Sequence, residues 1–122
     1  MRHLSFVACL FLAVTMSCEY HDKGLYNSCE VANPVEDLPW LKNIITDYET
    51  TPGDSTKFVY FVQGVYQAQT VFIHLNCCPF CMSVAPVLDC NGELLFYYGE
   101  PRSDQIKNQK VIWKASDSAC NF

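Results

Sequence analysis

The stretch FVYFVQGVYQAQTVFIHL, residues 58–75, decides the fold of this chain. Val, Phe, Tyr and Ile dominate both of its halves, and these residues favour strands because their side chains pack well on a pleated surface. The halves, residues 58–66 and 70–75, are separated only by Gln67-Ala68-Gln69, which is short enough for a hairpin. The stretch therefore predicts a pair of antiparallel strands.

A second hairpin is predicted further along the chain. Residues 84–89 and 93–98 have strand composition and flank Cys90-Asn91-Gly92. Asn-Gly is a strong hairpin signal because both residues tolerate positive φ. Residues 111–113 can supply a fifth, short strand. We therefore expect a four- to five-stranded, mainly antiparallel sheet.

One helix is predicted before the strands. Asp37 stands where an N-cap is expected, and Pro39 falls in the first turn, where its missing N–H is harmless. Apolar side chains then recur at helical spacing up to about Glu49, which indicates an amphipathic helix with one buried stripe. The stripe consists of Leu38, Leu41, Ile45 and Tyr48. The predicted fold class is α+β, with this N-terminal helix packed on the sheet.

The beginning of the chain has the pattern of a secretory signal. Arg2 and His3 precede an apolar run over residues 4–16, and Ser17-Cys18 follows. The run is roughly 13 residues long, shorter than the ~20 that span a bilayer as a helix, so we expect a signal sequence rather than a permanent span. A cysteine after a small residue is typical of bacterial lipoprotein signals, in which the cysteine is acylated, for example with palmitate. We therefore expect lipidation of Cys18; the alternative is ordinary secretion with Cys18 as a further thiol.

The remaining chain is expected to form one domain. Residues 1–17 are the predicted signal peptide, residues 18–32 are polar and are expected to be a tether, and residues 33–122 form a single small domain. Half of all residues are hydrophobic, which is enough to bury a core. The chain has 8 Lys and Arg against 13 Asp and Glu, with a formal net charge of −5. Nucleic acid is not expected as a partner, because phosphate binding needs a concentrated basic face.

The cysteines indicate an oxidising compartment. Six remain beyond Cys18, an even number that is compatible with three disulfides. They are Cys29, Cys77, Cys78, Cys81, Cys90 and Cys120. The sequence alone leaves all of their pairings open.

The segment from Cys78 to Asp89 permits a redox interpretation. Cys78-Pro79-Phe80-Cys81, followed by Ala-Pro-aliphatic-Leu-Asp, is similar to the active-site segment of thioredoxin-like proteins. That resemblance implies that Cys78 is a low-pKa nucleophile at a helix N-terminus and that Cys81 is the resolving thiol. Two features oppose it. The chain after Cys81 is too short for the rest of that fold, and Asn91-Gly92 turns it back where a long helix is required.

The same cluster permits two other interpretations. A tetrahedral zinc site is one, because His74, Cys77, Cys78, Cys81 and Cys90 offer more than four soft ligands. The export signal argues against it, since thiols in an oxidising environment usually pair. The other is a disulfide-stapled loop at one end of the sheet, with His74 as an ordinary strand residue. No G-x-S-x-G, H-E-x-x-H, Walker or G-x-G-x-x-G motif is present, so no catalytic residue is assigned and no cofactor is expected.

Several motifs resemble an uncharacterised family of small lipoproteins from Bacteroides-type bacteria. They are residues 33–42 (NPVEDLPWLK), residues 69–72 (QTVF), the cysteine cluster before residues 89–92 (DCNG), and residues 110–114 (KVIWK). The resemblance implies an outer-membrane lipoprotein facing the periplasm or the cell surface, with no catalytic residues to transfer. Family members usually have Gly where this chain has Ala68, and Ala disfavours the positive φ of a two-residue turn.

The expected function is that of a non-enzymatic interaction or structural accessory module; the alternative is a thiol-disulfide oxidoreductase that uses Cys78 and Cys81. Phe96, Tyr97 and Tyr98 offer a stacking surface for an envelope protein or a glycan. Ser55 and Ser118 lie in short Asp-Ser-small motifs similar to those that Bacteroides-type bacteria use for O-glycosylation. The expected partners are therefore the membrane, through Cys18, and an envelope protein or glycan.

Overall fold

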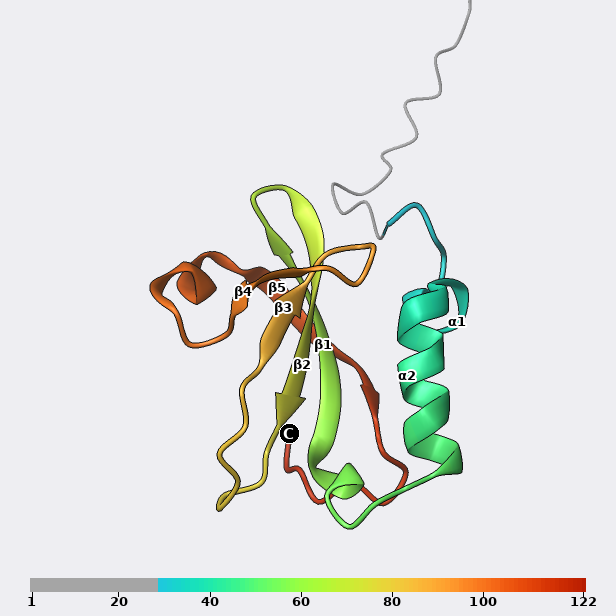
Figure 1. Ribbon diagram of the computed structural model, residues 1–122. Coiled ribbons are helices and arrows are strands. Elements are labelled where there is room, and N and C mark those ends of the chain that lie inside the picture. The colour runs from blue at the N-terminus through green and yellow to red at the C-terminus, as the bar shows by residue number, and fades with distance from the viewer. Residues whose placement is uncertain (1–28) are drawn as a thin grey trace, which may run out of the picture.

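The computed structural model describes residues 29–122, in which a helix packs on a five-stranded antiparallel sheet. This confirms the predicted α+β class (Figure 1). Helix α2 (Pro39–Thr50) precedes all of the strands. The strands are β1 (Val59–Tyr66), β2 (Gln69–Asn76), β3 (Pro86–Leu88), β4 (Leu94–Tyr97) and β5 (Lys107–Lys114). Their order across the sheet is β4-β3-β2-β1-β5.

The hairpin of β1 and β2 is closed by a two-residue turn. Tyr66 pairs with Gln69, and the two residues between them have positive φ, 48° at Gln67 and 61° at Ala68. The tight turn therefore forms although Ala68 stands where glycine is preferred. Pairing along eight residues of each strand holds the turn in this conformation.

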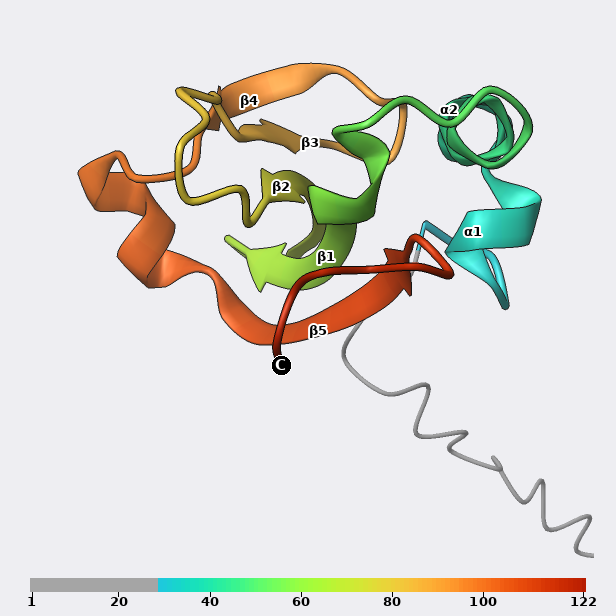
Figure 2. The same cartoon turned by 90° about the horizontal axis from the view of Figure 1, so that it is seen from below.

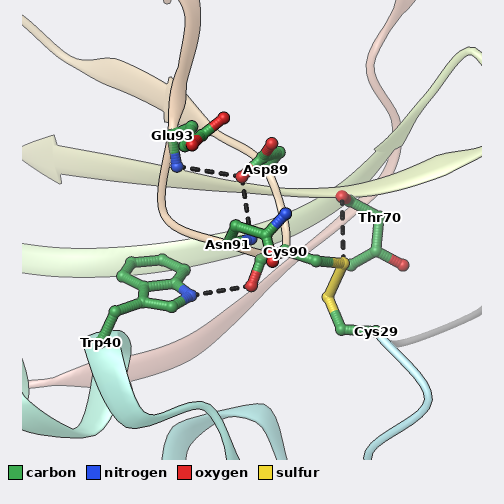
Figure 3. Close-up of a disulfide and its surroundings, with 7 residues drawn as sticks. All are labelled: Cys29, Trp40, Thr70, Asp89, Cys90, Asn91 and Glu93. Atoms are coloured by element: carbon green, nitrogen blue, oxygen red, sulfur yellow. Dashed lines mark hydrogen bonds between the residues drawn. A yellow bond between two sulfur atoms is a disulfide. The ribbon is translucent and has the colours of Figure 1, made fainter.

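The turn between β3 and β4 is held by one carboxylate. Asp89 Oδ1 accepts hydrogen bonds from the backbone N–H groups of Asn91 (2.8 Å) and Glu93 (2.9 Å), as Figure 3 shows. Gly92 has the positive φ that the Asn-Gly pair predicted, 78°, whereas Asn91 does not have a positive φ.

The helical region differs from the prediction at its start. Asp37 is not the N-cap of α2: it ends a separate short helix, α1 (Pro34–Asp37), and its carboxylate accepts a hydrogen bond from the N–H of Asn33 (2.8 Å). Leu38 is the N-cap instead and is extended, with φ −89° and ψ 109°. The reason is steric, because a residue before proline is driven out of the helical region by the following ring.

The two faces of the sheet bury separate apolar clusters. On the first face, the stripe of α2 packs against Phe61 and Phe72, as expected from its periodicity. The second face buries Val62, Val71, Ile73, Val87, Phe96 and Ile106. The chain crosses this face between the edge strands β4 and β5 through the 3₁₀ helix η2 (Pro101–Gln105), on the side away from α2 (Figure 2). Gly64 permits this close approach, since a Cβ there would lie 2.6 Å from Ile106 Cγ2.

The N-terminal segment is attached to the domain before α1. Cys29 forms a disulfide with Cys90, and Val31 packs against the cluster under α2. The last part of the expected tether, residues 29–32, is thus joined to the fold. Cys18 and the predicted signal peptide lie outside the described residues. No helix within residues 29–122 has the length and apolar composition needed to cross a bilayer.

Candidate functional site

Two of the three disulfides fasten the ends of the described chain to opposite ends of the sheet. Cys90, bonded to Cys29, lies beside the start of β2, with its Sγ 4.0 Å from the Thr70 carbonyl oxygen (Figure 3). Cys77, bonded to Cys120, follows the last residue of β2. Because β2 has eight residues, these disulfides are separated by about 25 Å along the strand.

The third disulfide, Cys78–Cys81, has a different role. It joins residues separated by 3 positions, compared with 61 for Cys29–Cys90 and 43 for Cys77–Cys120. A disulfide lowers the conformational entropy of the unfolded chain and so raises the free energy of unfolding. By the loop-entropy relation this increase is about 4 kcal/mol for each long-range bond and about 2 kcal/mol at most for a ring as small as that of Cys78–Cys81. The Cys78–Cys81 bond therefore shapes one loop and is expected to add less to global stability than either long-range bond.

We call this segment, residues 77–85, the CPFC loop. It has no helix or strand, and a turn at its start is formed by a hydrogen bond from Cys81 N–H to the Cys78 carbonyl (3.4 Å). Pro79 occupies the second position of the turn, where its fixed φ is favourable. The helix that the thioredoxin-like resemblance implied after Cys78 is absent from the described structure, so that expectation is wrong.

The base of the CPFC loop is held firmly. Cys77 donates its backbone N–H to the Phe58 carbonyl (2.9 Å) and is bonded to Cys120, whose Sγ lies 3.3 Å from the same carbonyl oxygen. Asn76 Oδ1 accepts a hydrogen bond from the N–H of Cys78 (2.8 Å). At its other end, the Ala85 carbonyl accepts a hydrogen bond from Tyr98 N–H (2.7 Å). The loop is thus a projection on a fixed base.

The side chains of the CPFC loop are apolar and exposed. Phe80 is 96% exposed, Met82 is fully exposed and Val84 is 75% exposed. No Lys, Arg, Asp or Glu occurs between residues 75 and 88, although the whole chain carries a net charge of −5. An uncharged, apolar projection of this kind is characteristic of a contact surface.

The candidate zinc ligands are not brought together. Each of the four cysteines is in a disulfide, and Cys90 is at the far end of β2 from the other three. No group of three or more potential metal-ligating His, Cys, Asp or Glu side chains occurs within residues 29–122.

His74 lies under α2 rather than beside the cysteines. Its ring stacks on that of Phe61, with centroids 4.7 Å apart, and its Nε2 is hydrogen-bonded to the Tyr48 hydroxyl (3.1 Å). Burial lowers the pKa of His74 below its ordinary value, because the charged imidazolium would lose its hydration. It therefore belongs to the packed layer between the helix and the sheet.

The predicted aromatic surface is only partly present. Phe96 is buried in the second cluster, so it is not available for stacking, whereas Tyr97 and Tyr98 are partly exposed. Tyr98 lines a shallow groove of about 300 Å³ together with Tyr60 and Phe122, whose rings are 4.8 Å apart. Two of the residues that line the groove are therefore aromatic rings in contact with each other.

The two candidate glycosylation sites differ in accessibility. Ser55 is exposed in the turn before the 3₁₀ helix η1 (Thr56–Phe58). Ser118 is half-buried, and its Oγ accepts a hydrogen bond from the N–H of Cys120 (3.3 Å). Of the two, Ser55 has the exposure to solvent that a bulky glycan requires.

Sequence reasoning identified Cys78 and Cys81 but missed the apolar side chains beside them. Phe80, Met82 and Val84 have the composition of core residues, and nothing in their spacing marks them as exposed. The available signal was the long segment without any charge, placed between two strands. No protein-family model matches this chain, and neither a similar curated protein nor a similar solved structure was found.

Proposed function

We propose that this chain is an extracytoplasmic interaction module, anchored to a bacterial outer membrane through a lipid on Cys18, that presents the CPFC loop to a partner protein. The observation behind this proposal is the exposure of three apolar side chains on one uncharged, disulfide-closed projection. Docking through these side chains requires no catalytic residue of this chain.

The position of the loop supports a role away from the anchor. Cys29, the first described residue, is bonded to Cys90 at the end of β2 opposite the CPFC loop. Figure 1 shows the loop, between β2 and β3, and the first described residues before α1 at opposite ends of the domain. The CPFC loop therefore lies at the end of the described domain that is distant from Cys29, where the chain enters from the expected anchor.

The chemistry of the loop favours a protein over a lipid surface. Loops and helices that enter the membrane interface combine apolar side chains with Lys or Arg, which contact anionic headgroups. The CPFC loop has no such residue. Its convex shape instead fits an apolar pocket of a partner, where a buried Phe contributes about 1.5–3 kcal/mol.

The compartment is supported by two observations. All six cysteines within residues 29–122 are paired, which is typical of proteins outside the cytoplasm. The lipoprotein-like start of the sequence and the resemblance of residues 33–114 to small envelope lipoproteins support the same location.

Site-specific photo-crosslinking in the native host tests the proposal. A photoreactive residue at position 80 is compared with one at position 94, because Leu94 is also an exposed apolar residue, at 50%, but lies on β4. We expect a discrete protein adduct from position 80 and none from position 94. The double variant Met82→Ser, Val84→Ser should abolish the adduct, whereas Leu94→Ser should leave it intact.

Two results would overturn the proposal. One is an adduct pattern that does not depend on the position of the probe or on Met82 and Val84. The other is flotation of the lipid-free protein with phosphatidylglycerol-containing vesicles that is lost in Phe80→Ser, since this would assign the loop to the membrane. If adducts form only between copies of this chain, the loop binds a second copy, and the proposal of a different partner protein is wrong.

A further inference from the structure

We propose that the Cys78–Cys81 disulfide is reversibly exchangeable and that the CPFC loop captures its partner through a cysteine thiol of that partner. The chemical class of the substrate is thus a polypeptide thiol or dithiol. The identity of the partner rests on the proposed function, but the exchange itself does not.

Accessibility of one sulfur-bearing residue separates this disulfide from the other two, because Cys81 is the only exposed cysteine within residues 29–122, while Cys29, Cys77 and Cys90 are half-buried. Cys81 is exposed and Cys78 is half-buried, in a segment without regular secondary structure. Cys120 is only 8% exposed, and the bond between Cys77 and Cys120 fastens the end of the sheet. Exchange requires direct approach of a thiolate to a sulfur atom, and exposed disulfides are the reducible ones.

The surrounding structure tolerates opening of this bond. The ring contains only Cys78, Pro79, Phe80 and Cys81, so its opening releases no other element of the fold. The turn with Pro79 and the hydrogen bond between Cys81 N–H and the Cys78 carbonyl keep the two cysteines close after reduction. The dithiol is therefore prearranged to close again.

The exchange balances as a two-electron transfer. A partner thiolate attacks Sγ of Cys81, the more exposed of the pair, and the bond to Cys78 breaks. Cys78 leaves as a thiolate and takes up a proton, and the partner is now joined to Cys81 by a mixed disulfide. A second partner thiolate then attacks the partner's own sulfur in that bond and releases Cys81. The partner loses two electrons and two protons as its disulfide forms, and the chain gains both as the Cys78/Cys81 dithiol.

Phe80 connects this chemistry to docking. Its side chain is almost fully exposed within the four-residue ring itself, and Met82 and Val84 follow directly. A partner segment that covers these side chains is placed against Cys81. An apolar peptide thiol should consequently react faster than a small hydrophilic thiol of similar acidity.

A redox titration tests the exchange. The purified protein is equilibrated in buffers with graded ratios of reduced to oxidised glutathione, quenched with acid, alkylated and mapped by peptide mass spectrometry. We expect Cys78 and Cys81 to become reduced together while the other four cysteines stay oxidised and the circular dichroism spectrum stays native. The glutathione adduct trapped on the pathway should be on Cys81, and it should be absent from the variant Cys78→Ser, Cys81→Ser. Reduction of this pair only together with the other two, with loss of the native spectrum, would overturn the inference.

A second measurement separates exchange from docking. Rates of reduction by an apolar cysteine peptide and by glutathione are compared for the wild type, Phe80→Ser and the control Leu94→Ser. We expect Phe80→Ser to slow the peptide about ten- to hundredfold and to leave the glutathione rate unchanged. If Phe80→Ser changes neither rate while the Cys81 adduct still forms, the proposal of docking through Phe80 is wrong and the proposal of disulfide exchange is supported. If crosslinking from position 80 succeeds but no glutathione adduct forms on Cys81, the proposal of disulfide exchange is wrong and the proposal of docking is supported.

Discussion

The indole N–H of Trp40 donates a hydrogen bond to the carbonyl oxygen of Cys90, with the two atoms 2.9 Å apart (Figure 3). This contact joins the first turn of α2 to the turn between β3 and β4, next to the Cys29–Cys90 disulfide. The indole also packs edge-on against Phe72 and covers Gly92, where a Cβ would come within 2.7 Å of the ring. Trp40 thus fixes the helix on one end of the sheet.

Trp40→Ala should lower the free energy of unfolding by about 3–5 kcal/mol, because both the ring packing and the hydrogen bond are lost. Chemical denaturation measures this change. An unchanged midpoint would show that the contact contributes nothing to stability.

Gly92→Ala tests the same packing from the other side. Gly92 and Gly99 both have positive φ, at 78° and 103°, but only Gly92 has a side chain against it. Alanine at either position should cost about 1–2 kcal/mol in backbone strain, and the Trp40 contact should add to this cost only at position 92. Equal losses of stability for Gly92→Ala and Gly99→Ala would contradict the described packing.

The hairpin turn offers a stabilising substitution. Gln67 and Ala68 both have the positive φ that Asn and Gly tolerate best. The variant Gln67→Asn, Ala68→Gly should therefore raise the free energy of unfolding by about 0.5–1 kcal/mol, which is the strain removed less the entropy that glycine adds to the unfolded chain. Thermal denaturation checks it. A lower melting temperature would mean that the turn is not of this type.

The central strands could be predicted because their composition and their burial agree. Residues 58–66 and 70–75 are mostly apolar, and every one of them is buried or half-buried. The first half of β5 was missed because Lys107 and Lys110 lie on an exposed edge, where no apolar pattern is required. The break between α1 and α2 arises because the ring of Pro39 keeps Leu38 out of the helical conformation. The spacing of apolar residues along a helix carries no information about this local steric effect.

The candidate site was less predictable than the fold. Disulfide connectivity among six cysteines is a property of the folded topology, which places Cys77 beside Cys120 and Cys90 beside Cys29. Phe80 is exposed because no helix or strand within residues 29–122 covers the loop, whereas the hydrophobicity of Phe80 alone predicts a buried side chain. The sequence therefore indicated the cysteines and not the surface around them.

His74 should make stability depend on pH. Its pKa is lowered by burial in the folded state and returns to about 6.5 on unfolding, so unfolding takes up a proton below that pH. The free energy of unfolding should then decrease as the pH falls from 7.5 to 5.5, by at most ~1.4 kcal/mol per pH unit. His74→Gln, which keeps a polar partner for Tyr48, should show a smaller decrease. Equal pH dependence of the two denaturation midpoints would exclude this role of His74.

Membrane attachment should depend on one cysteine. Each buried methylene of an acyl chain contributes ~0.8 kcal/mol to membrane binding, and all of the acyl chains are expected on Cys18. Cys18→Ser should move the protein from the membrane to the soluble fraction, whereas Cys9→Ser, within the predicted signal, should not. A Cys18→Ser protein that stays in the membrane pellet would refute the lipid anchor.

The most direct test of the whole account compares two disulfide deletions in the same assays. Cys78→Ser, Cys81→Ser should lower the free energy of unfolding by about 2 kcal/mol or less, and Cys77→Ser, Cys120→Ser by about 4 kcal/mol. Crosslinking of the partner from position 82 should nevertheless be lost in the first variant, because serine at positions 78 and 81 can neither close the ring around Phe80 nor exchange with a partner thiol. A first variant that loses as much stability as the second and keeps its crosslink would contradict the claim that this disulfide serves binding rather than stability.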